Sequence, residues 1–307
     1  MSMNIETPIV LIAFNRPDTT KIVFESIRNV KPKKLYVAID GPRKHKQGEA
    51  YRCKEVLEIT KKIDWNCDVK YLIREDNLGC KLGVSGAITW ALENEDRIIV
   101  IEDDIVATPN FFIFAEKLLE RFKDDNRIGM ISGNNYTPIT MDDDYLLSRY
   151  GHIWGWATWK RVWNKFDVEV PKINNALDKN LEKMSFVSAK EKRFYKKYYK
   201  KIASRIKNKT ENAWGPQFRF FRDQNSLLSI VPKVNLASNI GVNSSRTTAV
   251  SKGNENYYPA DSNFVLVKHP QNFEKNSTYD IHHFNAHVNR LSFFDKAIFK
   301  IRNFKNK

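Results

Sequence analysis

Short apolar runs alternate with stretches of helical periodicity through roughly the first 135 residues. Runs of β-branched apolar residues predict strands, and apolar positions spaced by three or four residues predict amphipathic helices. The predicted strands are residues 9–14, 35–39, 69–73, 98–101 and 128–132, and the predicted helices are residues 19–30, 49–63, 82–93 and 110–122. This alternation is typical of βαβ units, so the sequence predicts an α/β fold with a mostly parallel central sheet flanked by helices.

The regular alternation ends after about residue 135. Residues 134–166 are rich in Trp, Tyr, Gly and Asp. Further on, apolar positions spaced by four predict an amphipathic helix over residues 190–208 with a basic outer face. We expect three parts: an α/β half (residues 1–135), a helical and loop-rich region of the same domain (136–290) and a basic amphipathic tail (291–307).

Composition and charge narrow the class of protein. With 42% hydrophobic and 12% aromatic residues, the 307-residue chain can build a packed core and is not a disordered chain. Its 51 Lys and Arg against 36 Asp and Glu give a net charge of +15, which favours phosphate-bearing substrates, anionic lipid or nucleic acid as partners. Three cysteines without CxxC spacing and no visible secretory signal fit a reducing cytosol.

The most informative stretch is the predicted strand 98–101 and the three acids that follow it, Glu102, Asp103 and Asp104. Ligands of open α/β sheets bind at the carboxyl ends of the strands. Clustered carboxylates there repel one another unless a cation lies among them, and Mg²⁺ or Mn²⁺ binds carboxylate oxygens and phosphates. The alternative is a strand that ends in a solvated acidic turn.

Two other predicted strands also end in polar residues. Asn15-Arg16 follows the first strand and Asp40 follows the second, so both should lie in the same crevice as the acids. Taken singly, each is explained by turn chemistry, because Asn-Arg-Pro and Asp-Gly-Pro both form turns readily. Arg74 and Lys81 could neutralise a diphosphate or be ordinary loop cations. No GxGxxG and no GxxxxGK[ST] occurs, so the dinucleotide and P-loop interpretations fail.

These segments occur in the order seen in the GT-A glycosyltransferases. They are Ala13-Phe14-Asn15-Arg16-Pro17, Asp40-Gly41, Asn77-Leu78-Gly79, Glu102-Asp103-Asp104, Thr108-Pro109-Asn110-Phe111-Phe112 and Ile153-Trp154-Gly155-Trp156-Ala157-Thr158-Trp159. Over roughly residues 8–245 the chain resembles the N-acetylglucosaminyltransferase I type and its bacterial relatives. The resemblance implies a GT-A-like, Rossmann-type fold, with a nucleotide-sugar-binding half (1–135) and an acceptor-binding part (136–290).

The resemblance also implies roles for residues. Arg16 and Asp40 would contact uracil, Asp103 the ribose, and Asp104 a Mn²⁺ or Mg²⁺ ion. The segment 154–159 would shape the sugar and acceptor pocket, although its Trp residues could equally be core. The full set of expected substrate-binding residues is Phe14, Arg16, Asp40, Arg74, Lys81, Glu102, Asp103, Trp154, Gly155, Trp156 and Trp214.

The chain departs from the relatives at two positions. They commonly carry an acid where Gly215 stands, and this acid would be the inverting general base. Glu211 is the nearest carboxylate and our expected catalytic base; Asp223 is the alternative. Relatives often carry a Thr-His pair where this chain has Arg246-Thr247-Thr248, so a His metal ligand is not expected.

The expected function is metal-dependent transfer of a sugar from a nucleoside diphosphate sugar, a UDP sugar in the relatives, to a hydroxyl of a glycan or lipid-linked acceptor. A hexosyl- or N-acetylhexosaminyltransferase of bacterial surface polysaccharide synthesis fits this pattern. A sugar-phosphate nucleotidyltransferase should carry a Gly-rich loop after its first strand, and this chain has Ala13-Phe14-Asn15-Arg16 there. A nucleic-acid-binding protein would use residues 190–209, but its Tyr residues are spaced as a core stripe.

The C-terminal segment 291–307 bears on where in the cell the protein is located. Leu291, Phe294, Ile298 and Ile301 are spaced by three and four, so residues 291–304 can form a basic amphipathic helix. Such a helix can lie in the interface of an anionic membrane, or can dock on its own domain. No apolar run approaches the roughly 18 residues that cross a bilayer. We expect a cytoplasmic protein, with the inner face of the cell membrane as a candidate peripheral site.

Overall fold

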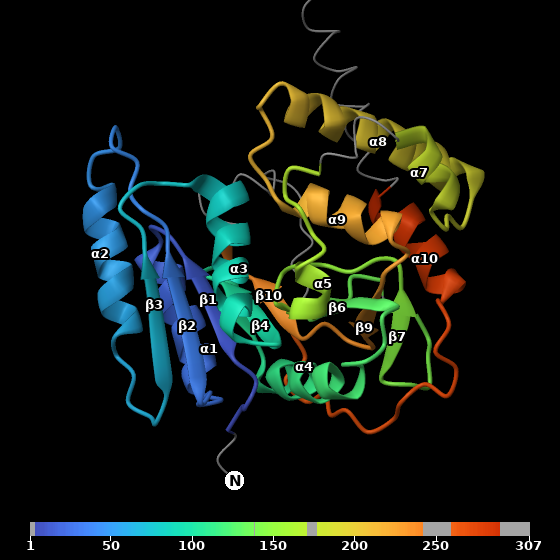
Figure 1. The fold of residues 1–307 in the computed structure, drawn as a ribbon. Coiled ribbons are helices and arrows are strands. Elements are labelled where there is room, and N and C mark those ends of the chain that lie inside the picture. The colour runs from blue at the N-terminus through green and yellow to red at the C-terminus, as the bar shows by residue number, and fades with distance from the viewer. Residues whose placement is uncertain (1–3, 138, 171–176, 242–258, 289–307) are drawn as a thin grey trace, which may run out of the picture.

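The computed structural model describes residues 4–137, 139–170, 177–241 and 259–288, and its centre is an eight-stranded sheet (Figure 1). Its strands are β1 (Ile9–Ala13), β2 (Lys34–Ile39), β3 (Asp68–Ile73), β4 (Arg97–Glu102), β6 (Ile128–Ser132), β7 (Tyr145–Ser148), β8 (Trp156–Trp159) and β9 (Leu228–Pro232). They lie in the order β3-β2-β1-β4-β8-β6-β9-β7. Four of the seven neighbouring pairs are parallel, so the predicted mostly parallel α/β sheet is confirmed.

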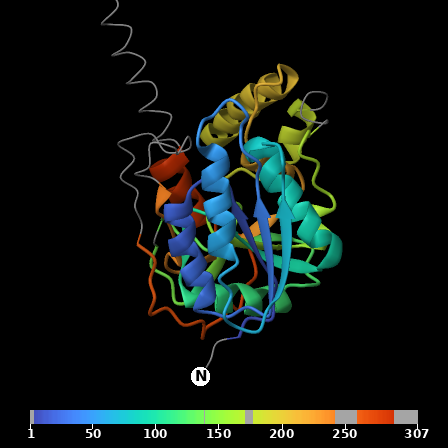
Figure 2. The ribbon, with the colours of Figure 1, turned by 90° about the vertical axis from the view of Figure 1, so that its left-hand side faces the viewer.

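Helices cover both faces of this sheet. They are α1 (Pro17–Arg28), α2 (Glu49–Thr60), the π-helical η1 (Cys80–Val84), α3 (Ser85–Asn94), α4 (Pro109–Arg121), α5 (Lys160–Trp163), α7 (Leu177–Lys183), α8 (Ala189–Lys207), α9 (Gly215–Gln224), α10 (Ser277–His283) and the π-helical η3 (Phe284–Val288). Figure 2 shows α1 and α2 on one side of the strands and α3 on the other. The first half of the chain is therefore doubly wound, an arrangement that gathers ligands at the carboxyl ends of its strands.

Three strands of the first half, β1, β2 and β4, are buried on both faces, whereas the edge strand β3 is partly exposed. All of β1 and nearly all of β2 and β4 are buried, which explains their continuous apolar runs rather than alternation. A second apolar cluster lies beneath α8, where Tyr195, Tyr199 and Ile202 are buried. This confirms the amphipathic helix predicted for residues 190–208. Tyr195 and Tyr199 are thus unavailable for stacking on nucleic-acid bases, which weakens that alternative.

The sequence pattern missed the strands of the second half. We expected helices and loops after residue 135, but β8 inserts antiparallel between β4 and β6, and β7 and β9 extend the sheet. The misreading has a physical cause: β8 is only four residues long and consists of Trp, Ala, Thr and Trp, so no alternation reveals it. A small two-stranded sheet of β5 (Ile105–Ala107) and β10 (Ala237–Asn239) lies beside the acidic segment.

Two sequence predictions fall outside the described residues: the tail 291–307 and the Arg246-Thr247-Thr248 segment. Within the described ranges, no helix is both long and apolar enough to cross a membrane.

Candidate functional site

A cavity of about 230 Å³ lies at the carboxyl ends of β1, β2 and β4. It brings together residues that are far apart in the sequence but that end neighbouring parallel strands. Eight of the sequence-predicted site residues line it: Phe14, Arg16, Asp40, Arg74, Glu102, Asp103, Asp104 and Trp154. We refer to it as the strand-end cavity.

The acidic triplet is tied to Arg16. Arg16 Nη1 lies 2.8 Å from Asp104 Oδ2, and Nη2 donates to Asp103. The backbone N–H of Phe14 donates to Asp103 Oδ2 at 3.1 Å, so β1 and β4 are fastened at their ends. Burial alone would lower the pKa of Arg16, but the two aspartates raise it, so this guanidinium stays charged.

One guanidinium does not neutralise three carboxylates. The pKa of Glu102 is raised to about 8 because the group lies out of water and beside Asp104 and Asp103. Burial likewise raises the pKa of Asp103, against the attraction of Arg16. The crowded carboxyl groups therefore disfavour one another's ionisation, and a bound cation would relieve this repulsion and favour the charged forms.

The oxygens around Asp104 suit a hard divalent cation. A Cβ added at Gly241 would lie 2.5 Å from Asp104 Oδ2 and 3.1 Å from Asn239 Oδ1, so the glycine lets this segment pack against both oxygens. Asp104 Oδ2 accepts from Arg16 and Asn239 Oδ1 accepts from the Gly241 N–H at 2.8 Å, so an ion would bind first to the other oxygen of Asp104. Carboxylate and amide oxygens are ligands that Mg²⁺ and Mn²⁺ accept. Among the described residues, no group of three or more His, Cys, Asp and Glu could hold a metal by itself, so an ion here would need oxygens from a substrate or water.

Asp40 organises the loop that closes one side of the cavity. Its carboxylate accepts hydrogen bonds from Asn77 Nδ2 at 2.9 Å, Leu78 N at 3.0 Å and Gly79 N at 2.9 Å. A Cβ at Gly41 would lie 2.4 Å from the backbone of Asp76, so the two loops pack as closely as glycine allows. Arg74 donates to the Gly83 carbonyl at 3.0 Å and holds the start of the following helix.

A buried carboxylate that the sequence did not single out supports Phe14. Glu49 is fully buried at the start of α2 and accepts from Asn15 Nδ2 at 2.7 Å and from Arg43. The hydrogen bonds from Arg43 outweigh burial and lower the pKa of Glu49 to about 2. The guanidinium of Arg43 in turn lies 5.6 Å from the centre of the Phe14 ring.

Several expected substrate-binding residues do not reach the strand-end cavity. Trp156 and Trp214 are buried and stack on each other with ring centroids 5.6 Å apart, so they pack the core. Gly155 has a positive φ of 71° and packs so closely that a Cβ would lie 2.9 Å from Ala237. Lys81 forms an ion pair with Glu169 at 2.7 Å instead of lining the cavity.

The expected general base, Glu211, lies elsewhere. It is buried, accepts from Ala213 N at 3.1 Å and lies 3.7 Å from Arg205. The alternative, Asp223, is buried and bound by Arg149, Arg219 and Tyr199. Neither carboxylate lines the strand-end cavity.

A second cavity of about 320 Å³ adjoins the first and shares Trp154 with it. Its other lining residues are Tyr136, Gly151, His152, Ile153, Tyr198, Gly215, Pro216, Phe218, Arg219 and Arg222. We refer to it as the arginine cavity. The sequence pointed to Trp154 and Gly215 in its wall but not to Arg219 and Arg222, whose pattern is that of ordinary helix cations.

Comparisons with known proteins give no family. No protein-family model matches the chain, and no curated protein matches it. Among solved structures, HddC from Yersinia pseudotuberculosis is 14% identical over 52% of this chain and 80% of its own, with a TM-score of 0.32. UDP-glucose pyrophosphorylase, solved with UDP-glucose, is 10% identical over 47% of this chain and 62% of its own, with a TM-score of 0.26.

A third structure, 4-diphosphocytidyl-2C-methyl-D-erythritol synthase from Anaerococcus prevotii DSM 20548, is 10% identical over 64% of this chain and 83% of its own, with a TM-score of 0.32. Similarities this weak carry no argument about substrate or reaction, so the functional argument rests on the geometry of the site.

Proposed function

We propose that this chain is a metal-dependent glycosyltransferase that moves a hexosyl or N-acetylhexosaminyl unit from a UDP sugar to a hydroxyl of a glycan acceptor. The observation that carries the proposal is the strand-end cavity, where Arg16, Asp40 and the triplet 102–104 lie together. An acidic cluster with cations beside it matches a nucleoside diphosphate that binds through a divalent metal. The adjoining arginine cavity would give the acceptor a place beside the donor.

The reaction breaks the bond between the anomeric carbon and the diphosphate oxygen and forms a bond from that carbon to the acceptor oxygen. The nucleoside diphosphate leaves, and the acceptor hydroxyl gives its proton to a base. Asp104, with Asn239 beside it, would hold Mn²⁺ or Mg²⁺, which as a Lewis acid stabilises charge on the leaving diphosphate. Asp103 would accept a hydrogen bond from a ribose hydroxyl. Asp40 holds the 77–79 loop in place, and the uracil ring would lie against this loop.

Glu211 is the proposed proton acceptor. In this structure it contacts Ala213 and Arg205, so the role requires the Glu211 side chain to turn toward the cavities while Trp214 stays in the core. A base must come within hydrogen-bond reach of the proton, and such contacts are often long before substrate binds.

A panel of nucleoside diphosphate sugars tests the proposal. With Mn²⁺ or Mg²⁺, we expect hydrolysis of at least one UDP sugar, stopped by a chelator and restored by added metal. The rival nucleotidyltransferase activity would instead release pyrophosphate from a nucleoside triphosphate and a sugar 1-phosphate. Pyrophosphate release without turnover of any nucleotide sugar would contradict glycosyl transfer.

A further inference from the structure

One face of α9 forms a wall of the arginine cavity. Gly215, Phe218, Arg219 and Arg222 recur at helical spacing and all line it. The opposite walls come from Tyr198 of α8 and the 151–154 segment. The volume of about 320 Å³ lies in the range of roughly 300–1,000 Å³ that is usual for small-ligand sites.

Arg222 is a buried cation without a carboxylate. Its residue is 2% exposed, and Nη1 donates to the hydroxyl of Ser229. Among the described residues its Nε has no hydrogen-bond partner and no ion pair joins it to an acid. Burial and the neighbouring Arg219 lower its pKa to about 10, which still leaves it charged at neutral pH.

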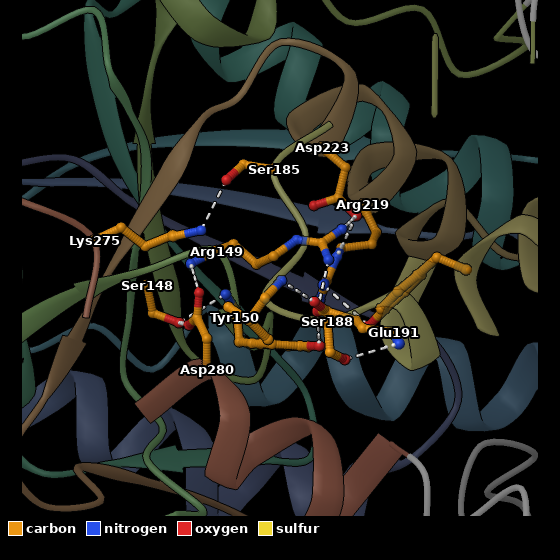
Figure 3. A network of polar contacts seen from close by, with 12 residues as sticks. Ser148, Arg149, Tyr150, Ser185, Ser188, Glu191, Arg219, Asp223, Lys275 and Asp280 are labelled. Carbon is orange, nitrogen blue, oxygen red and sulfur yellow. Dashed lines mark hydrogen bonds and ion pairs between the residues drawn. The ribbon is translucent and has the colours of Figure 1, made fainter. Parts of the chain in front are cut away.

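The carboxylates nearby are already engaged by other arginines (Figure 3). Arg149 lies 2.6 Å from Glu191 and 2.6 Å from Asp223, and Arg219 lies 3.1 Å from the same Asp223 oxygen. Asp280, on the other side of the network, accepts from Ser148 and from the backbone of Arg149. In the described part of the chain, Arg149, Arg219 and Arg222 thus have only two ion-paired carboxylates among them, Glu191 and Asp223. The unbalanced positive charge belongs to Arg222, which lines the cavity.

The start of α9 adds to this positive potential. Gly215 and Pro216 line the cavity, no side chain caps this end, and the first turn holds no acid. The N-terminal end of a helix carries roughly half a positive charge and binds anions. His152 contributes no charge to the cavity, because burial lowers its pKa to about 3 and leaves it neutral.

The remaining wall is aromatic. Tyr136, Trp154, Tyr198 and Phe218 line the cavity, and Trp154 also lines the strand-end cavity. Aromatic faces pack well against the C–H faces of a sugar ring, while a guanidinium binds carboxylate or phosphate oxygens through paired donors.

We propose that the arginine cavity binds the acceptor through an acidic sugar, one that carries a carboxylate or a phosphate. Arg222, Arg219 and the start of α9 bind the anionic group, and the aromatic residues bind the ring. That the occupant is the acceptor rests on the proposed glycosyltransferase function; the preference for an anionic sugar rests on the cavity alone.

The test is calorimetry on the full chain with glucuronate, glucose 6-phosphate and glucose, alone and with UDP and Mn²⁺ present. We expect the two acidic sugars to bind at least about tenfold more tightly than glucose, a difference of about 1.4 kcal/mol. UDP should not compete with them. Whichever of glucuronate and glucose 6-phosphate binds more tightly shows whether the cavity prefers a carboxylate or a phosphate.

Two variants locate the site. Arg222→Met should remove the preference for acidic sugars. Because a buried Arg222 also supports the fold, Ile153→Trp provides a second variant that fills the cavity and keeps every charge. Arg28→Met is the matched control: this arginine lies on α1 and lines neither cavity, so the variant should retain the preference for acidic sugars.

The outcomes separate the two proposals. Equal binding of glucose and the acidic sugars, or a preference that survives Ile153→Trp, overturns the cavity assignment even if UDP sugars are turned over. A preference for acidic sugars that both folded variants lose supports the assignment, and the absence of any UDP-sugar turnover in the same protein then counts only against the transferase function.

Discussion

Arg16 Nη1 lies 2.8 Å from Asp104 Oδ2, and this ion pair, with that to Asp103, joins the loop after β1 to the end of β4. This ion pair uses only Oδ2 of Asp104. Among the described residues, Arg16 makes no contact with Oδ1 of Asp104. Asp104 is therefore the residue through which cation binding and donor binding should be coupled.

Asp104→Ala should reduce metal-dependent turnover of the donor by about 100-fold or more. A metal ion stabilises the transition state by several kcal/mol, and each tenfold change in rate corresponds to about 1.4 kcal/mol. Initial rates across a Mn²⁺ titration measure this, and circular dichroism checks that the fold persists. Asp96→Ala, an exposed acid just before the opposite end of β4, is the control. Unchanged turnover in Asp104→Ala would remove the metal assignment.

Asp40→Ala should weaken UDP binding strongly, because three hydrogen bonds that hold the 77–79 loop disappear together. At about 1 kcal/mol each, their loss should also lower the melting temperature. Calorimetry with UDP gives the affinity. Asp76→Ala, which removes an exposed acid of the same loop, should bind normally. If Asp40→Ala binds UDP like the parent, Asp40 has only a turn-forming role.

Glu211→Gln should reduce transfer far more than donor binding if this carboxylate accepts the acceptor's proton. The two quantities are measured separately, as kcat for transfer and as the dissociation constant for UDP. Gln keeps the acceptor atom for the Ala213 N–H, so the local backbone should hold. Equal kcat in variant and parent would direct the search to Asp223 or to a substrate-assisted route.

Asp280 should make stability depend on pH. The residue is fully buried, and burial raises its pKa from 3.8 to about 6 despite the hydrogen bond from Ser148. The folded state therefore favours the protonated carboxyl, and its contribution to stability is full below pH 4 and lost as pH rises through 6. Relative to Asp280→Asn, the parent should lose about 2 kcal/mol between pH 4 and 7.

Urea unfolding of the parent and of Asp280→Asn at several pH values measures this difference. Asn can still accept from Ser148, so the variant isolates the charge. A stability difference that stays constant from pH 4 to 7 would show that Asp280 is ionised in the folded protein throughout.

The tail remains a prediction from the sequence alone. Full-length protein should co-sediment with anionic vesicles at low salt, and a chain that ends before Leu291 should not, because the basic amphipathic segment would be lost. Raising the salt should release the full chain. Equal behaviour of the two chains would exclude a membrane role for this segment.

The sequence predicted the residues of the strand-end cavity better than those of the arginine cavity. Long apolar runs such as 98–101 identify buried parallel strands, and the polar residues that end them, Arg16, Asp40 and Asp103, do line one cavity. Trp156 was ambiguous because aromatic residues serve both cores and sugar sites, and its burial decides for the core. The sequence did not identify Arg219 and Arg222 as site residues. Their excess positive charge is visible only in the structure, where Asp223 is paired with Arg149 and Arg219.

The insertion of β8 between β4 and β6 has a consequence for dissecting the chain. A fragment that stops at residue 135 would lack β8 and β9, which pair with these two strands. It would expose the backbone N–H and C=O groups of β4 along an apolar edge, a surface that pairs with other chains. The α/β half (residues 1–135), although continuous in sequence, should therefore aggregate when expressed alone, and any fragment meant to isolate it must extend through β9.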